Sequence, residues 1–182
     1  MLRYNYIPGD IIQVQKQYKI PYIVHQVNCQ GKMGSGVAKA IRNVYPIVYD
    51  KYMEKYREAE RKIYEGFDLI EASSMDPSSF LLGEIQVVNV GENRNVVNFF
   101  SQLGYGYDGR RYTSYDAFWN CLHLLKQEVP KGSSVAFPAQ IGCGLGGANW
   151  TIILQMIIEV LGQDYEIYIV DYNGGNENAD TD

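Results

Sequence analysis

The sequence predicts a single α/β domain built on a mixed sheet of about six strands. The 182 residues suit one domain of ordinary size. Two apolar strands, at residues 20–28 and 133–138, each run into a glycine-rich loop and then into a helical pattern. A polar turn joins two β-rich segments, 81–91 and 95–101, and indicates an antiparallel pair, so we expect a mixed sheet.

The composition excludes several classes of protein. Hydrophobic residues (46%) and charged residues (20%) are near globular averages, which argues against a disordered chain or a coiled coil. Sixteen Lys and Arg against 21 Asp and Glu give a net charge of −5, which disfavours bulk nucleic-acid binding. The three cysteines are widely spaced and form no CxxC motif, so we expect neither disulfides nor a metal site. No signal peptide or membrane span is evident, so we expect a cytoplasmic monomer without membrane contact.

The first half of the chain continues from the first glycine loop into helices. Apolar residues recur at helical spacing from Val37, and Pro46 should break or restart this helix. Residues 49–64 place tyrosines and charged side chains on opposite faces, which predicts an amphipathic surface helix. Residues 65–80 are rich in Ser, Asp and Pro and predict a loop or an irregular insertion without chemistry.

The second half returns to the sheet. Residues 105–114 form a polar loop, and Ser114 can cap a helix that runs to about residue 128. The remaining elements are a strand at 133–138, a glycine loop at 140–147, a helix at 148–161 and a strand at 165–172. Residues 173–182, NGGNENADTD, predict a disordered acidic tail outside a domain of residues 1–172.

The two glycine loops indicate a ligand with two phosphates. Backbone N–H groups of such loops approach a phosphate closely, and the helix that follows favours negative charge at its N-terminus. Both loops would meet at one edge of the sheet if their strands are parallel neighbours. Neither loop has the Walker or the G-x-G-x-x-G spacing, so the spacing itself identifies no nucleotide-binding class.

Three motifs in the same order resemble the macro domain, an ADP-ribose-binding module: GDI at 9–11, VNCQGKMGSGVAKAI at 27–41 and PAQIGCGLGGANW at 138–150. The resemblance implies a three-layer α/β/α sandwich. The HxxNCxG form at 25–31 and the IGCGLxxxxW form at 141–150 are most similar to the ADP-ribose-1″-phosphate phosphatases of the small phage and yeast type. They resemble more distantly the terminal ADP-ribose protein glycohydrolases.

The resemblance implies roles for individual residues. Asp10 would accept from the adenine amino group beside the Ile11 backbone, Asn28 would hold hydroxyls of the distal ribose, and Tyr172 would stack on or near adenine. The diphosphate would lie between two loops, Gly34, Ser35, Gly36 and Val37 in the first and Ile141, Gly142, Cys143, Gly144 and Leu145 in the second. Without the resemblance, Asp10 would be interpreted as a turn or cap residue, and Cys143 as a small space-filling side chain.

Departures from the family pattern bear on the reaction. The glycohydrolases have a lysine and an aspartate where this chain has Gln102 and Gly146, which argues against that activity. The phosphatases use a histidine, matched by His25, and an aspartate, for which Asp108 and Asp116 are both candidates. We prefer Asp108 because loops carry function more often than helix interiors.

One geometric difficulty concerns His25. It lies three residues before Asn28, and an odd separation places the two side chains on opposite faces of a strand unless the strand bends. His25 is therefore either a catalytic residue or a structural one beneath the loop. The expected function is hydrolysis of the terminal phosphate of ADP-ribose-1″-phosphate, without metal or cofactor. The alternatives are a non-catalytic ADP-ribose reader or sponge, and a de-ADP-ribosylating hydrolase.

Overall fold

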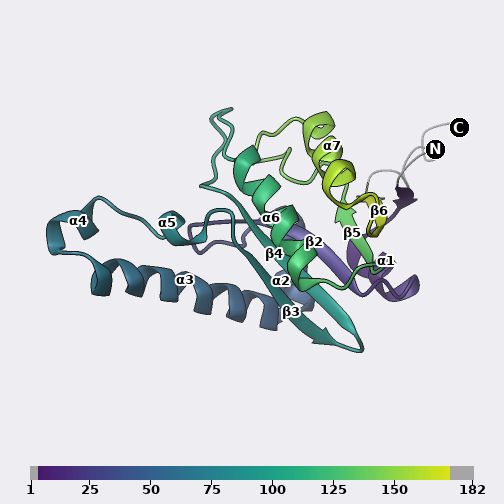
Figure 1. Ribbon diagram of the computed structural model, residues 1–182, viewed down its shortest axis with the longest axis horizontal. Coiled ribbons are helices and arrows are strands. Elements are labelled where there is room, and N and C mark those ends of the chain that lie inside the picture. The colour runs from purple at the N-terminus through teal and green to yellow at the C-terminus, as the bar shows by residue number, and fades with distance from the viewer. Residues whose placement is uncertain (1–3, 173–182) are drawn as a thin grey trace, which may run out of the picture.

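The computed structural model describes residues 4–172, and the tail expected at 173–182 lies outside the described residues. A six-stranded sheet with the order β1-β6-β5-β2-β4-β3 forms its centre (Figure 1). Only β3 is antiparallel to its neighbour in this part of the chain, so the predicted mixed sheet is confirmed. The strands are β1 (Asn5–Pro8), β2 (Tyr22–Asn28), β3 (Ile85–Gly91), β4 (Arg94–Gln102), β5 (Ser134–Pro138) and β6 (Glu166–Asp171).

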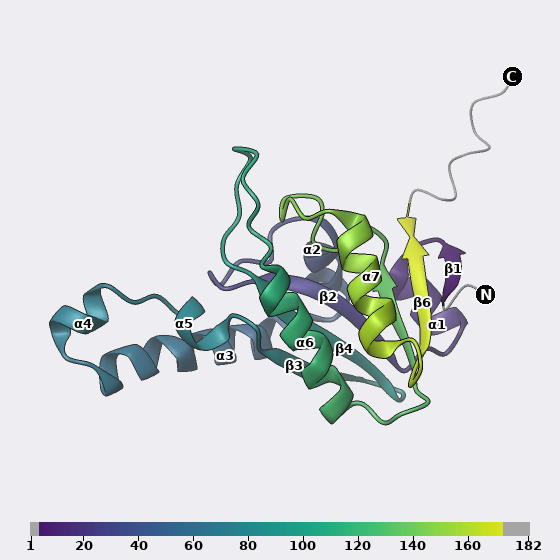
Figure 2. The same ribbon diagram turned by 45° about the horizontal axis from the view of Figure 1, so that its top comes forward.

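Helices cover both faces of the sheet and complete the three layers (Figure 2). One apolar core joins the sheet to α1, α2 and α3, and a second joins it to α6 and α7. The helices are α1 (Ile11–Gln17), α2 (Gly36–Val44), α3 (Pro46–Gly66), α4 (Leu69–Ser73), α5 (Ser78–Leu81), α6 (Tyr115–Glu128) and α7 (Trp150–Leu161). None of these helices combines the length and the apolar character needed to cross a membrane.

Local signals in the sequence correctly predict where several helices begin and end. Pro46 is the first residue of α3 and separates it from α2, because its ring fixes φ and it lacks an N–H donor. The Ser114 side chain accepts from the Ala117 N–H and caps α6, as predicted.

The prediction of a loop at residues 65–80 was wrong in part. α3 continues to Gly66, and two short helices, α4 and α5, follow. Asp68 begins α4 by accepting from the N–H groups of Ile70 and Glu71. The later part of α3 and α4 extend away from the sheet (Figure 1). α4 and α5 each bury a single side chain, which explains why the apolar pattern of residues 65–80 gave no helical signal.

The pairing of β2 creates an opening at one edge of the sheet. β2 pairs with β4 along its whole length, but with β5 only where Tyr22 and Ile23 face Val135 and Ala136. Beyond Ile23 the two strands separate. The strand order also reverses at β2, since the chain continues to β4 on one side of β2 and later to β5 on the other side. Such a switch point is where open α/β sheets bind ligands.

Candidate active site

A cavity of about 700 Å³ lies where β2 and β5 separate. This volume falls in the range of small-molecule sites. The cavity is lined by residues 25–28, 32–38, 102, 105, 107, 138–142 and 144–146. The ends of two parallel strands and both glycine loops therefore surround one space, which is hereafter called the cleft.

Most of the loop residues expected to hold a diphosphate border the cleft. These are Gly34, Ser35, Gly36, Val37, Ile141, Gly142, Gly144 and Leu145. Cys143 is not among the lining residues. Its thiol contacts the Ile141 carbonyl at 3.5 Å, and burial raises its pKa to about 11, so it is a protonated packing group.

The first glycine loop presents the open end of a helix to the cleft. Ser35 stands at the N-cap of α2, but its side chain makes no capping hydrogen bond. At α6, by contrast, Ser114 caps the helix with its hydroxyl. The first N–H groups of α2 are therefore left for a ligand, and the helix dipole makes an anion favourable there. Gly36 has a φ of +54°, a conformation that favours glycine at this turn.

Asn28 is held rigidly at the end of β2. Its Oδ1 accepts from the N–H of Gln30 at 3.0 Å and from the Tyr52 hydroxyl at 2.9 Å. Its Nδ2 donates to the Lys32 carbonyl at 2.9 Å. Tyr52 comes from α3, is fully buried and stacks on Phe100. One amide hydrogen of Asn28 remains to donate to a ligand hydroxyl in the cleft.

His25 borders the same cleft as Asn28, although three residues separate them. Asn28 is the last residue of β2, and its side chain bonds to Tyr52 of α3, so it does not follow the alternation expected for a straight strand. The His25 ring is buried, and its Nε2 lies 2.5 Å from Asn98 Oδ1. Burial lowers its pKa to about 4, although the hydrogen bond to Asn98 opposes this shift. The imidazole is therefore neutral at pH 7.

A polar network supports the second glycine loop from below. Gln26 Nε2 donates to Gln102 Oε1 at 2.8 Å and to Thr113 Oγ1 at 2.9 Å. The Thr113 hydroxyl in turn donates to the Gly142 carbonyl at 2.8 Å. A side chain at Gly146 would collide with the Thr113 hydroxyl and the Gly142 carbonyl. The aspartate of the glycohydrolase pattern therefore cannot stand at this position without movement of the loop.

Besides Cys143, four of the residues expected to be catalytic or ligand-binding lie away from the cleft lining. Asp10 caps α1, since its Oδ1 accepts from the N–H groups of Ile12 and Gln13 at 2.9 and 3.0 Å. Ile11, which follows it, is buried in α1. Tyr172 is exposed immediately after β6. β1 and β6 are parallel neighbours, and the Gly9 N–H donates to the Asp171 carbonyl at 2.9 Å. Asp10 and Tyr172 therefore lie near one another at the same edge of the sheet as the cleft.

The fourth of these residues, Asp108, lies in the loop between β4 and α6, which projects from the body of the protein (Figure 2). Its carboxylate forms an ion pair with Arg110 at 3.2 Å and accepts from the Tyr112 hydroxyl. The other candidate, Asp116, is exposed in the first turn of α6. Neither carboxylate borders the cleft as it stands.

Sequence reasoning did not identify several lining residues as ligand-binding ones. Lys32 borders the cleft, and its place between the glycines of the first loop could have marked it. Gln26 was a polar residue inside an otherwise apolar strand, which is also a usable signal. Tyr105 and Tyr107 come from the projecting loop and carried no signal. Within residues 4–172, no group of three or more His, Cys, Asp and Glu side chains is placed to hold a metal ion.

Comparison with known proteins identifies related chains. The Macro domain family model matches residues 24–157. The uncharacterized 17.5 kDa protein in the tk-vs intergenic region of Enterobacteria phage T4 is 28% identical over 170 residues, which is 92% of this chain and 96% of the phage protein. The ADP-ribose 1″-phosphate phosphatase of Meyerozyma guilliermondii is 30% identical over 82 residues, covering 43% of this chain and 46% of that protein. The macrodomain of Mycobacterium tuberculosis DarG superimposes with a TM-score of 0.66 at 21% identity, over 92% of this chain and 96% of that one.

Proposed function

Because the chain belongs to the macro domain family, we propose that its cleft binds ADP-ribose and that the protein hydrolyses the terminal phosphate of ADP-ribose-1″-phosphate. The observation that carries the binding proposal is the pair of glycine loops that border one cleft. One of them exposes the uncapped N-terminus of α2. Backbone donors on two sides suit a diphosphate, since each phosphate then receives hydrogen bonds without a competing side chain.

The ligand would extend along the edge of the sheet. The diphosphate lies between the loops, and the distal ribose lies at the free amide hydrogen of Asn28. The adenosine then reaches toward the ends of β6 and β1. There Tyr172 is exposed, and the Asp10 carboxylate can accept from an adenine amino group. Asp10 would serve both as the cap of α1 and as a ligand contact.

The phosphatase step requires a terminal phosphate beside the distal ribose. Water attacks the phosphorus and gives up a proton, the bond between phosphorus and the ribose oxygen breaks, the ribose oxygen takes up a proton, and inorganic phosphate and ADP-ribose leave. Asn28 orients the ribose, and the Lys32 ammonium stabilises negative charge on the transferring group. Neutral His25 is the nearby group with a lone pair to accept the proton of the water. The partial likeness to a named phosphatase supports this activity over other hydrolase activities.

A non-catalytic ADP-ribose reader is the second candidate, and two observations favour it. Asp108 is engaged with Arg110 and Tyr112 outside the cleft, so among residues 4–172 no carboxylate borders the cleft with His25. The lowered pKa of His25 also makes it a weak base near neutral pH. Turnover with retained binding distinguishes the enzyme from the reader.

The test is phosphate release from ADP-ribose-1″-phosphate in metal-free buffer, with calorimetry of ADP-ribose binding on the same sample. We expect both in the wild type, and loss of release in Asn28→Ala. Asn43→Ala is the matched control, since it makes the same chemical change at an exposed position of α2 outside the cleft lining and should leave release intact. Binding without release would support the reader, and release that persists in Asn28→Ala would contradict the proposed site.

A further inference from the structure

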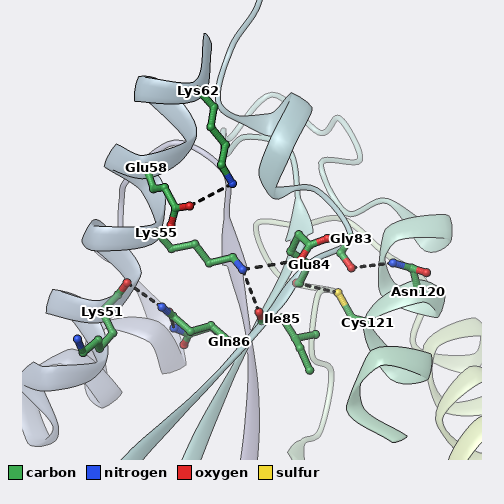
Figure 3. A network of polar contacts seen from close by, with 11 residues as sticks. Lys51, Lys55, Glu58, Lys62, Gly83, Glu84, Ile85, Gln86, Asn120 and Cys121 are labelled. Carbon is green, nitrogen blue, oxygen red and sulfur yellow. Dashed lines mark hydrogen bonds and ion pairs between the residues drawn. The ribbon is translucent and has the colours of Figure 1, made fainter. Parts of the chain in front are cut away.

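A chain of polar side chains crosses three strands on the α3 side of the sheet. It starts at His25 on β2, passes through Asn98 on β4 and Gln86 on β3, and ends at the Lys51 carbonyl of α3. The His25 Nε2 lies 2.5 Å from Asn98 Oδ1, and Asn98 Nδ2 donates to Gln86 Oε1 at 3.0 Å. Gln86 Nε2 donates to the Lys51 carbonyl at 2.8 Å, as Figure 3 shows. His25 and Asn98 are buried, and Gln86 is half-buried.

The Lys51 carbonyl fixes the orientation of both amides in this series of hydrogen bonds. The Lys51 oxygen can only accept, so the Gln86 amide must turn its NH₂ group toward it. The Gln86 oxygen then faces Asn98 and receives a hydrogen from its NH₂ group. Asn98 consequently presents its oxygen to His25. Reversing either amide would bring two acceptors or two donors together, which is costly for buried groups.

The orientation of the Asn98 amide also decides which nitrogen of the His25 ring carries the proton. An oxygen that faces Nε2 requires that this nitrogen carry the proton, because the ring is neutral and a neutral imidazole has one donor and one acceptor. Nδ1 then holds the lone pair. This Nδ1 is buried, and no hydrogen-bond partner for it exists within residues 4–172. His25 also borders the cleft. A buried acceptor without a partner among the described residues requires a donor from another molecule, and the place of His25 at the cleft makes a ligand or its water that donor.

We propose that Asn98 and Gln86 are positioning residues that hold His25 in the tautomer protonated on Nε2, so that Nδ1 accepts a hydrogen bond from the ligand or its attacking water. The tautomer follows from the Lys51 carbonyl and stands without any assumed activity. The acceptor role of Nδ1 rests on the proposed function. Neither Asn98 nor Gln86 borders the cleft, so both act through His25.

The tautomer can be measured directly, because the chain has only two histidines, His25 and His123. The full chain labelled with ¹⁵N in its histidine rings is recorded by long-range ¹H–¹⁵N correlation at pH 7, and His123→Gln assigns the two rings. We expect His25 Nε2 to resonate as a protonated nitrogen and Nδ1 as an unprotonated one, with the other tautomer below about a tenth. A His25 ring protonated on Nδ1 would overturn the proposal.

Variants test whether the hydrogen bonds from the Lys51 carbonyl through Gln86 and Asn98 set the tautomer of His25. Gln86→Leu removes the contact with the Lys51 carbonyl and frees the Asn98 amide to turn, so both tautomers of His25 should become populated. Asn98→Asp should keep the proton on Nε2, since a carboxylate can only accept, and should raise the pKa of His25. Gln155→Leu makes the same chemical change on an exposed position of α7 and should leave the spectrum unchanged. An unaltered tautomer ratio in folded Gln86→Leu would refute the positioning role of Gln86 and Asn98.

Two further readouts separate this inference from the proposed function. Saturation with ADP-ribose should move the Nδ1 resonance toward that of a hydrogen-bonded acceptor, and an unchanged Nδ1 resonance would overturn the acceptor role. Gln86→Leu should lower kcat for phosphate release about tenfold with little change in KM, and an unchanged kcat would likewise refute a role in turnover. If the wild type releases no phosphate, the phosphatase proposal fails, while the tautomer is still decided by the spectrum.

Discussion

The same added methyl group should have different effects at two glycines of the second loop, Gly144 and Gly146. A Cβ at Gly146 would lie well inside contact distance of the Thr113 hydroxyl and the Gly142 carbonyl, and 2.9 Å from Gln26 Nε2. A Cβ at Gly144 meets nothing within 4 Å, and Gly144 borders the cleft. We therefore expect Gly146→Ala to damage the fold and Gly144→Ala to damage ligand binding alone.

The size of the first effect follows from what must move. The Gly142 carbonyl is backbone, and the Thr113 hydroxyl is bonded to it at 2.8 Å, so neither can withdraw freely. The Gly146 carbonyl also accepts from the N–H groups of Tyr112 and Thr113, which ties the loop to its neighbour. Overpacking of this kind costs about 1–3 kcal/mol. Since backbone lies on one side, we expect about 2–3 kcal/mol, or a decrease in Tm of about 4–12 °C for a domain of this size.

Urea unfolding and calorimetry with ADP-ribose measure the two effects on the same samples. Gly144→Ala should unfold within about 0.5 kcal/mol of the wild type. Its affinity for ADP-ribose should fall at least about tenfold, because the methyl group keeps the phosphate from the backbone. Gly146→Ala with wild-type stability would refute the packing argument. Gly144→Ala with wild-type affinity would remove that loop from the site.

Three further predictions concern single side chains. Tyr52→Phe should lower the free energy of unfolding by about 1–2 kcal/mol in urea, because Asn28 loses a buried hydrogen-bond donor; no change would show that this bond is unimportant. Asp10→Ala should cost about 1 kcal/mol by uncapping α1, whereas Asp10→Asn should keep the cap but weaken ADP-ribose binding; equal affinity for the wild type and Asp10→Asn would leave Asp10 a cap only. Since the pKa of His25 is about 4 in the fold and about 6.5 when unfolded, the unfolded chain takes up the proton first and stability falls as pH drops below 6.5. Between pH 7 and pH 5 this loss is about 2 kcal/mol, and His25→Gln should remove it; the same slope in that variant would assign the loss to other groups.

Elements specified by neighbouring residues were predictable. The two units of strand, glycine loop and helix were evident because apolar runs and glycines mark them locally. β1 carried no such signal. It is a short edge strand whose side chains are largely exposed, and its pairing with β6 defines it. The short helices α4 and α5 were missed for a similar reason, since each buries a single side chain.

The candidate site likewise combines features set by neighbouring residues with features set by residues far apart in the sequence. The glycine loops could be placed from the sequence because a left-handed φ, such as +54° at Gly36 and +75° at Gly142, is a local requirement that glycine meets best. Asn28 and His25 were named by resemblance, but their surroundings were not foreseen. Tyr52 reaches Asn28 from 24 positions along the chain, and Asn98 reaches His25 from 73.

By itself, the sequence determined that this protein has two strands that each run into a glycine loop and a helix, so that a diphosphate could bind between the loops if the strands are parallel neighbours. Only the tertiary structure decided that β2 and β5 separate to open the cleft, that Asp108 stands outside it, and that the Lys51 carbonyl orients His25 through two amides. The physical reason is the distance along the sequence between the residues that interact. Backbone conformation is set by adjacent residues, whereas the partner of a buried polar group is chosen by the packing of distant strands and helices.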